Sequence, residues 1–279
     1  MNTGRESAKL WESPIPGVEL FQAHLFHHRF GKHFHEAYTI GLNDSGQGGF
    51  LHQGTSHGAT PGRFNLINPG EVHTGQVRSS EGWAFRDIYI STSQVEQLLA
   101  QLEWQGQGMP YFSEPVVGDQ ALRSAFHRLF TALSEPVNQL TQQSLMLGFF
   151  SQLFSRYAKP RYSWQATPPE TKAIARVRAY LEEHYAENLS IDTLAQFVGL
   201  SPFYLIRSFH QQMGLPPHSY QRHWQLLQAK QALRSSKPLS EIAVEHGFYD
   251  QSHFNRHFKR SFGLTPGQYR KNNRTARII

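Results

Sequence analysis

Two stretches in the C-terminal half of this 279-residue chain repeat one pattern of residues at nearly constant spacing. The first copy contains Ala195, Gly199, Arg207, Phe209, Gly214, Leu215, Pro217 and Tyr220. The second contains Ala243, Gly247, Arg256, Phe258, Gly263, Leu264, Pro266 and Tyr269. The offset is 48 residues up to the first glycine and 49 residues after it, so the second copy has one extra residue in its turn. Each copy reads as a short helix, a glycine turn and a second helix, the arrangement of a helix-turn-helix.

Capping residues indicate where the helices of the first copy begin. Ser190 is a predicted N-cap for a helix over residues 191–198, and Gly199 supplies the turn after it. Ser201 caps the next helix, predicted over residues 202–213, whose first residue is a proline that needs no amide hydrogen. Two such units on one chain suggest a protein that contacts two adjacent stretches of DNA.

The helical period divides the second helix of each copy into two faces. The predicted buried residues are Leu205, Phe209 and Met213 in the first copy, and Phe254, Phe258 and Phe262 in the second. The expected DNA contacts are Ser201, Phe203, Ile206 and Arg207, and Gln251, Ser252, Asn255, Arg256 and Lys259. Arginine pairs with guanine, asparagine and glutamine pair with adenine, and apolar side chains touch thymine methyl groups. The alternative is that these residues form ordinary solvated helix faces.

A continuous helix is predicted between the two copies, over residues 218–235. At 1.5 Å per residue, a helix of about 18 residues is roughly 27 Å long. A spacer of this size is suited to set two recognition helices about one DNA turn, ~34 Å, apart. The same pattern also fits an ordinary bundle helix.

The charge of the chain is distributed unevenly. Residues 1–157 contain 10 Lys and Arg against 13 Asp and Glu, a net charge of −3. Residues 158–279 contain 17 against 8, a net charge of +9. The basic excess coincides with the repeat, where it favours binding to the phosphate backbone of DNA.

The segment from Thr171 to Ala276 resembles the AraC/XylS family of bacterial transcription regulators. The strings that carry the resemblance are GLSPFYLIRSFHQQMGLPPHSY and EIAVEHGFYDQSHFNRHFKRSFGLTPGQYR. The resemblance implies two helix-turn-helix units in successive major grooves of promoter DNA, and RNA polymerase as a further partner. It also implies a regulator, most often an activator, rather than an enzyme, and the chain offers no catalytic residues.

The N-terminal half has a different pattern, with short strands separated by turns. Strands are expected over residues 18–26, 37–42, 49–52, 63–67 and 83–90, with turns at 43–46 and 68–70. Helices are expected over residues 93–102, 119–133 and 139–157. The predicted fold class is α+β: a cupin-like β-barrel or jelly roll with appended helices over residues 1–157, a linker over 158–170, and an all-α DNA-binding domain over 171–279.

Two histidine-containing strings in this half resemble the two cupin motifs. The first is GKHFHE, with His33 and His35, and the second is GRFNLINPGEVH, which ends at His73. The glutamate expected after the second histidine is missing, because Thr39 and Ile40 occupy its place. On a strand, His33 and His35 would share one face.

These histidines support two interpretations. In the first, His33, His35, Tyr38 and His73 bind a small-molecule effector, and no cofactor is required. In the second, His33, His35 and His73 hold a metal ion through three nitrogen atoms, as in a metal sensor or a metal-dependent cupin enzyme fused to a DNA-binding domain.

Composition excludes several classes of protein. The chain has no cysteine, so disulfides, thiolate metal sites and cysteine nucleophiles are absent. No stretch approaches the ~20 apolar residues of a membrane span, and a cytoplasmic location without a membrane partner is expected. The helices over 119–133 and 139–157 carry apolar faces, and in families of this kind such a pair often forms a homodimer interface.

Overall fold

A computed structural model describes residues 6–102, 104, 108–160 and 171–276 of the chain. The chain divides into two compact units, Met1–Ser163 with Lys271–Ile279, and Trp164–Arg270. The first residues of the expected linker, Ala158–Pro160, form strand β12. The rest of that linker, residues 161–170, lies outside the described residues.

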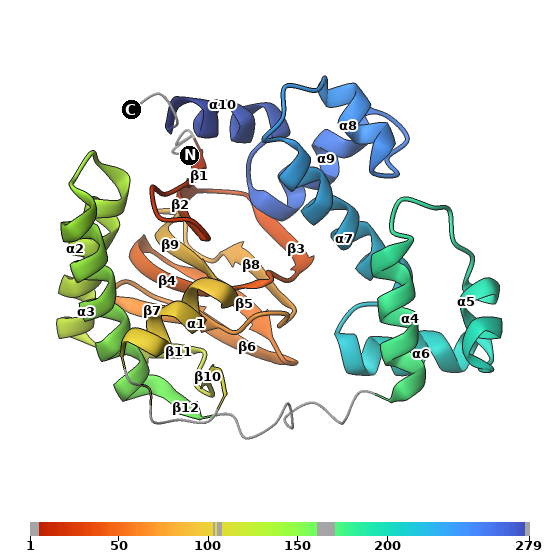
Figure 1. Cartoon of the computed structure of the whole chain (residues 1–279), viewed down its shortest axis with the longest axis horizontal. Helices are drawn as coiled ribbons and strands as arrows, with labels where there is room; N and C mark the ends of the chain where they lie inside the picture. Colours follow the sequence, from red (N-terminus) through yellow and green to blue (C-terminus); the bar gives the residue numbers. More distant parts are fainter. Residues whose placement is uncertain (1–5, 103, 105–107, 161–170, 277–279) are drawn as a thin grey trace. The chain divides into compact units, whose positions relative to one another are not determined.

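The first unit is built on two antiparallel sheets (Figure 1). The six-stranded sheet contains β1 (Ser7–Glu12), β2 (Val18–Leu25), β9 (Trp83–Ser91), β4 (Ala37–Gly46), β7 (Arg63–Ile67) and β11 (Val116–Gly118), in that order. The four-stranded sheet contains β3 (Arg29–His33), β8 (His73–Val77), β5 (Gly48–His52) and β6 (Thr55–Ala59). Strand β10 (Pro110–Phe112) pairs with β12.

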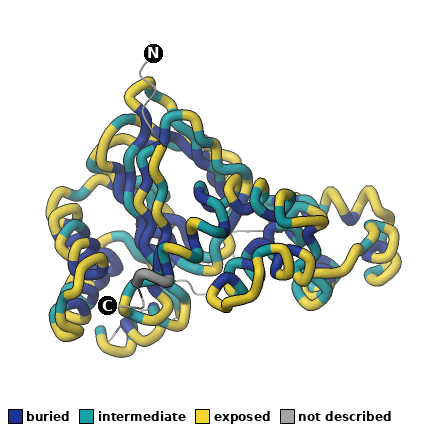
Figure 2. The backbone as a smooth tube through the Cα atoms, turned by 90° about the horizontal axis from the view of Figure 1, so that it is seen from above, coloured by how far each residue is buried: buried dark blue, intermediate teal, exposed yellow. Residues whose placement is uncertain are grey.

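Helices cover one face of the six-stranded sheet. They are α1 (Thr92–Gln101), α2 (Gln120–Ser134) and α3 (Gln139–Tyr157). Their apolar side chains join Leu20, Ile40, Phe64 and Ile88 of the sheet in one buried core. Figure 2 shows the buried segments of the backbone in dark blue and the exposed segments in yellow.

The other face of this sheet meets the four-stranded sheet. Phe30 of β3 makes edge-on ring contacts with Phe21 of β2 and Phe85 of β9, at centroid distances of 6.4 Å in both cases. Because side chains alternate along a strand, residues next to the helix-facing ones point into the space between the sheets. This inner face is the place where the candidate effector site is found.

Four of the five expected strands agree with the structure to within one residue at each end, and the fifth, β4, begins where expected but continues to Gly46. The predicted turn over residues 43–46 is therefore wrong: the chain continues as β4, with a bulge between Asn43 and Ser45. The Asn43 side chain donates to the carbonyl of Arg63 at 2.8 Å and accepts from the indole nitrogen of Trp83 at 2.9 Å. These contacts from β7 and β9 hold the strand extended through the polar sequence. The mixed α+β class is confirmed.

The second unit is helical. It contains α4 (Lys172–Glu183), α5 (Ile191–Val198), α6 (Pro202–Met213), α7 (Pro217–Ala232), α8 (Leu239–Glu245) and α9 (Gln251–Phe262), and α10 (Pro266–Ala276) begins in it. Helices α5 and α6 have the predicted bounds. Helix α7 ends at Ala232, so the predicted helix over 218–235 is shorter at its C-terminal end. None of the described helices is long and apolar enough to cross a membrane.

The sequence repeat is also a structural repeat. Matched apolar residues are buried in both copies, as Phe209 and Phe258, each at 0% exposure, illustrate. The exception is Met213, which was predicted to be buried like Phe262 but is only half-buried. The glycines that follow α6 and α9, Gly214 and Gly263, both adopt a left-handed conformation, with φ of 73° and 77°. Helices α6 and α9 therefore lie in two helix-turn-helix copies with closely similar buried residues.

Candidate DNA-binding faces and effector site

Each helix-turn-helix is set by a left-handed glycine and a side-chain cap. Gly199 and Gly247 have φ values of 68° and 78°, a conformation that side-chain-bearing residues rarely adopt. Ser201 accepts a hydrogen bond from the backbone nitrogen of Tyr204 at 3.3 Å, and Asp250 accepts one from that of His253 at 2.6 Å. These caps begin α6 and α9 after short turns and orient both helices.

The face of α6 expected to contact DNA is exposed and largely apolar. Phe203 is 75% exposed and Ile206 is 41% exposed, and Ser201 and Arg207 are exposed beside them. Tyr204, at 56%, adds another exposed aromatic ring. Exposed apolar side chains of this size cost free energy in water, so their clustering on one helix indicates a contact surface.

The corresponding face of α9 is polar. Ser252, Arg256 and Lys259 are exposed, and Gln251 is half-buried. Asn255 is also half-buried, and its Oδ1 atom is shielded from solvent without a hydrogen-bond partner among the described residues. A base contact through Oδ1 of Asn255 therefore requires the side chain to rotate.

Sequence reasoning missed Tyr249, which lies in the turn before α9 and is 88% exposed. Its neighbour Phe248 is buried at 3%. The second copy has one more residue in this turn than the first, and the extra length leaves Tyr249 on the surface. The inserted residue was the available signal.

The second helix-turn-helix contains a histidine with a lowered pKa, His257. Burial lowers its pKa to about 4, and the positive charges of Arg222, Arg256 and Arg260, together with His253, act in the same direction. His257 is therefore neutral at physiological pH. The matched residue of the first helix-turn-helix is Ser208, which does not titrate.

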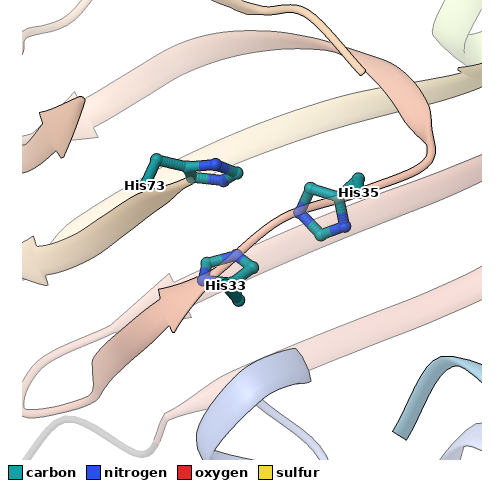
Figure 3. Close-up of side chains that lie close together, drawn as sticks. All are labelled: His33, His35 and His73. Carbon is teal, nitrogen blue, oxygen red and sulfur yellow. The ribbon is translucent and has the colours of Figure 1, made fainter. Parts of the chain in front are cut away.

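In the N-terminal unit, which holds the two β-sheets, the three predicted histidines come together (Figure 3). One potential ligand atom of each of His33, His35 and His73 lies within 4.8 Å of the other two. His33 and His73 end β3 and begin β8 and are paired in register, whereas His35 lies in the segment after β3. His33 and His73 are buried, and His35 is half-buried.

Backbone carbonyls orient two of these rings. Nδ1 of His33 lies 2.8 Å from the carbonyl oxygen of Gly31, and Nδ1 of His73 lies 3.0 Å from that of Glu71. Burial lowers the pKa of His73 to about 4, against the opposing effect of the Glu71 carbonyl. His73 is therefore a neutral imidazole near pH 7, able to donate from one nitrogen and to accept at the other.

Glu71, which the sequence did not single out, braces the loop before His73. Its carboxylate accepts from Nε2 of His52 at 2.9 Å and from the backbone and side-chain nitrogens of Asn68, both at 3.0 Å. Burial alone would raise the pKa of Glu71, but these hydrogen bonds and the charge of His52 lower it below its ordinary value. The ionised carboxylate holds the loop that positions His73.

Polar groups of the six-stranded sheet complete the surroundings of the histidines. The Tyr89 ring lies 4.7 Å from that of His35, and its hydroxyl donates to Asp87 at 3.2 Å. Burial raises the pKa of Asp87 to about 7. Thr39, paired with Tyr89 in register, has a buried hydroxyl without a hydrogen-bond partner among the described residues. The neighbourhood suits a small polar ligand.

Tyr38, expected beside the histidines, lies elsewhere. It alternates with Thr39 on β4, so it points to the helix-covered face, where it joins the core at 3% exposure. Its hydroxyl donates to the carbonyl of Pro110 at 2.7 Å. The structure thus brings together His33, His35 and His73, but not Tyr38.

Comparisons with known proteins find matches for both halves of the chain. Residues 15–150 match the model of the AraC-like ligand binding domain, and residues 194–272 match that of a helix-turn-helix domain. The chain is 30% identical over 248 residues to the uncharacterized HTH-type transcriptional regulator YbfI of Bacillus subtilis, covering 89% of this chain and 90% of that protein. It is 27% identical over 244 residues to the arabinose operon regulatory protein of Escherichia coli, covering 84% and 80%.

Among solved structures, an apo form of a ToxT variant from Vibrio cholerae has a similar fold, with a TM-score of 0.61 over 93% of this chain and 99% of that chain at 13% identity. Wild-type ToxT with a bound unsaturated fatty acid gives a TM-score of 0.58 at 15% identity, over 91% of this chain and 94% of that chain. With two matching domains and a relative similar over nearly its full length, the chain belongs to the AraC family of transcription regulators, in which a small molecule controls a DNA-binding protein.

Proposed function

We propose that this regulator contacts bases in two successive major grooves through the exposed faces of α6 and α9. In the first helix-turn-helix the contacts are Ser201, Phe203, Ile206 and Arg207. In the second helix-turn-helix they are Gln251, Ser252, Asn255 and Arg256, with Lys259 on a phosphate. The observation that carries this proposal is the structural repeat, in which matched residues are buried while both arginines are exposed.

The proposal includes activation of transcription. The relatives include a protein named HTH-type transcriptional activator RhaS, and the AraC-type architecture favours an activator that contacts RNA polymerase at its promoter. We further propose that the chain acts as a homodimer in the cytoplasm, where promoter DNA is found. Size measurement in solution tests the dimer, and in vitro transcription from a cognate promoter tests activation.

Effector binding is proposed at His33, His35 and His73, with Tyr89 beside them. A screen of small molecules for a rise in the melting temperature of the full chain identifies the effector, because a ligand bound only to the folded state stabilises it. We expect His73→Ala to reduce this rise while DNA binding without effector is kept. An unchanged response in a folded His73→Ala variant would remove the histidines from the site.

DNA binding itself is tested with the full chain and duplex DNA over a range of salt concentrations. We expect the affinity to fall steeply as salt rises, because phosphate contacts release counterions. Binding that does not depend on salt, or no binding to any duplex, would contradict the proposed DNA contacts.

A further inference from the structure

The imidazole rings of His33, His35 and His73, in the N-terminal β-sheet unit, form a compact nitrogen-donor set. The ring centroids of His33 and His73 lie 4.3 Å apart, those of His33 and His35 4.9 Å, and those of His35 and His73 5.3 Å. Figure 3 shows the rings gathered around a common space. We propose that His33, His35 and His73 together bind one divalent first-row transition metal ion. This inference deepens the proposed sensor function, because it assigns a ligand chemistry to the same site.

Hydrogen bonding orients two of the rings for metal ligation. A carbonyl oxygen can only accept, so the contacts of Gly31 and Glu71 place the proton of His33 and His73 on Nδ1. In a neutral ring the lone pair is then on Nε2. Histidines that bind metals use the same arrangement, in which the second ring nitrogen donates to a carbonyl or carboxylate and fixes the ring.

The distances allow coordination after a small adjustment. A tetrahedral zinc ion with bonds of ~2.0–2.1 Å places its nitrogen ligands about 3.4 Å apart. The potential ligand atoms here lie within 4.8 Å of one another, so coordination requires them to approach by up to ~1.4 Å. His35 has the most room to move, because it is the least buried of the three and lies outside the strands.

The donor set selects the class of ion. Three neutral nitrogens suit zinc, nickel, copper or ferrous iron, whereas magnesium and calcium prefer oxygen ligands. Three protein ligands leave a fourth position for water or for an oxygen atom of an effector. The carboxylate of Glu71 is engaged with His52 and Asn68, so it braces His73 and does not serve as a ligand.

The test uses the full chain, stripped with a chelator and then given Zn²⁺ in competition with a chelator of known affinity. We expect one zinc ion per chain by elemental analysis. His33→Ala, His35→Ala and His73→Ala should each weaken binding by roughly 100-fold or more, since each removes one ligand. His27→Ala is the matched control, because His27 is an exposed histidine of the same unit and should keep full binding.

Folding and adventitious binding are controlled in the same experiment. Circular dichroism of the metal-free variants checks their fold, and His35→Gln replaces His35→Ala if the latter does not fold. Co²⁺ in place of zinc should give the visible absorption of a low-coordinate nitrogen site, and this absorption should be lost in His35→Gln. No retained zinc, or equal retention by wild type and all three variants, would overturn the inference.

DNA binding measured on the same samples separates the two proposals. Salt-dependent DNA binding by a chain that retains no zinc overturns the metal site and leaves the DNA-binding proposal intact. Stoichiometric zinc that requires the three histidines, in a chain that binds no duplex, supports the metal site and contradicts the DNA-binding proposal.

Discussion

The two helix-turn-helix units have the same buried framework but different exposed helix faces. In the first unit α6 exposes Phe203, Tyr204 and Ile206. In the second, the equivalent positions of α9 hold Ser252, His253 and Asn255, and Arg256, which matches the exposed Arg207 of α6, and Lys259 are exposed beside them. Below these faces the matched phenylalanines are fully buried in both. Packing therefore constrains one side of each helix, while the other side is open to a different mode of DNA contact.

The difference suggests a division of roles between the units. An apolar face recognises thymine methyl groups and the shape of the groove, and a polar face forms hydrogen bonds with base edges and phosphates. Both helix-turn-helix units expose a matched arginine, so we expect the first unit to add apolar contact to its arginine and the second to add further hydrogen bonds and charge.

The largest effect is expected from removal of the matched core rings. Phe209→Ala and Phe258→Ala should each lower the free energy of unfolding by about 3–5 kcal/mol, because both side chains are fully buried. Urea denaturation of the full chain, followed by helical circular dichroism, measures the loss. Phe203→Ala, at a site 75% exposed, should change stability by less than ~0.5 kcal/mol. A difference above ~2 kcal/mol between the two core variants would show that the frameworks are not equivalent.

Matched arginines should give the next largest effect. Arg207→Ala and Arg256→Ala should each cost about 1–3 kcal/mol of binding free energy on the preferred DNA site, with a smaller loss on random DNA. Titrations of labelled duplexes at fixed salt measure both losses. Equal losses on preferred and random DNA would place the arginines on phosphates instead of bases.

Acid should lower the stability of the second helix-turn-helix more than that of the first. The pKa of His257 is lowered to about 4, so the unfolded chain takes up its proton at a higher pH than the folded chain does. The stability present above pH ~6.5 is therefore lost as pH falls toward 4, by roughly 1–2 kcal/mol after solvent screening is allowed for. Hydrogen exchange at pH 7 and pH 5, corrected for intrinsic rates, should show α9 losing more protection than α6.

The control for this acid effect is His257→Gln, which removes the titrating group. In that variant the difference between α6 and α9 should become smaller, and the remainder is expected from His253, whose pKa is also lowered by burial and by the charges of Arg222 and Arg256. Equal acid sensitivity of the two helices in the wild-type chain would exclude His257 as the cause.

The smallest effects distinguish apolar contact from charge. Ile206→Ala should cost about 1 kcal/mol on the preferred site without altering the salt dependence, because it removes only apolar contact. Lys259→Ala should weaken all sequences alike and reduce the slope of log affinity against log salt by about 1. The outcome that contradicts this division is a slope changed by Ile206→Ala and unchanged by Lys259→Ala.

In the helical DNA-binding unit, local signals in the sequence predicted the bounds of α5 and α6. Ser190, Ser201 and Gly199 predicted the ends of α5 and the start of α6, because caps and left-handed glycines act over a few residues. Helix α7 was predicted three residues too long, since no strong stop signal follows Ala232. The exposed Tyr249 was missed, because the repeat was compared by matched residues and the inserted one has no match.

In the N-terminal β-sheet unit, dependence on long-range contacts limited how much of the structure could be predicted from the sequence. The sequence predicted that His33, His35 and His73 lie together, since two sequence motifs carried them. Tyr38 was assigned to the same group, yet it shares one face of β4 with Ile40 and Leu42, which places it in the helix-covered core. The short strand β3, with the glutamate brace at Glu71, depends on partners distant in sequence, which no local pattern reveals.

The central claim is that the two units contact separate half-sites through α6 and α9. Selection of preferred duplexes from a random pool, carried out in parallel with wild type, Arg207→Ala and Arg256→Ala, tests it most directly. We predict that each variant loses the preference at one base pair, and that the two affected positions lie about 10–10.5 base pairs apart, one turn of the duplex. Loss of preference at the same position in both variants, or unchanged preferences in both, would contradict the account.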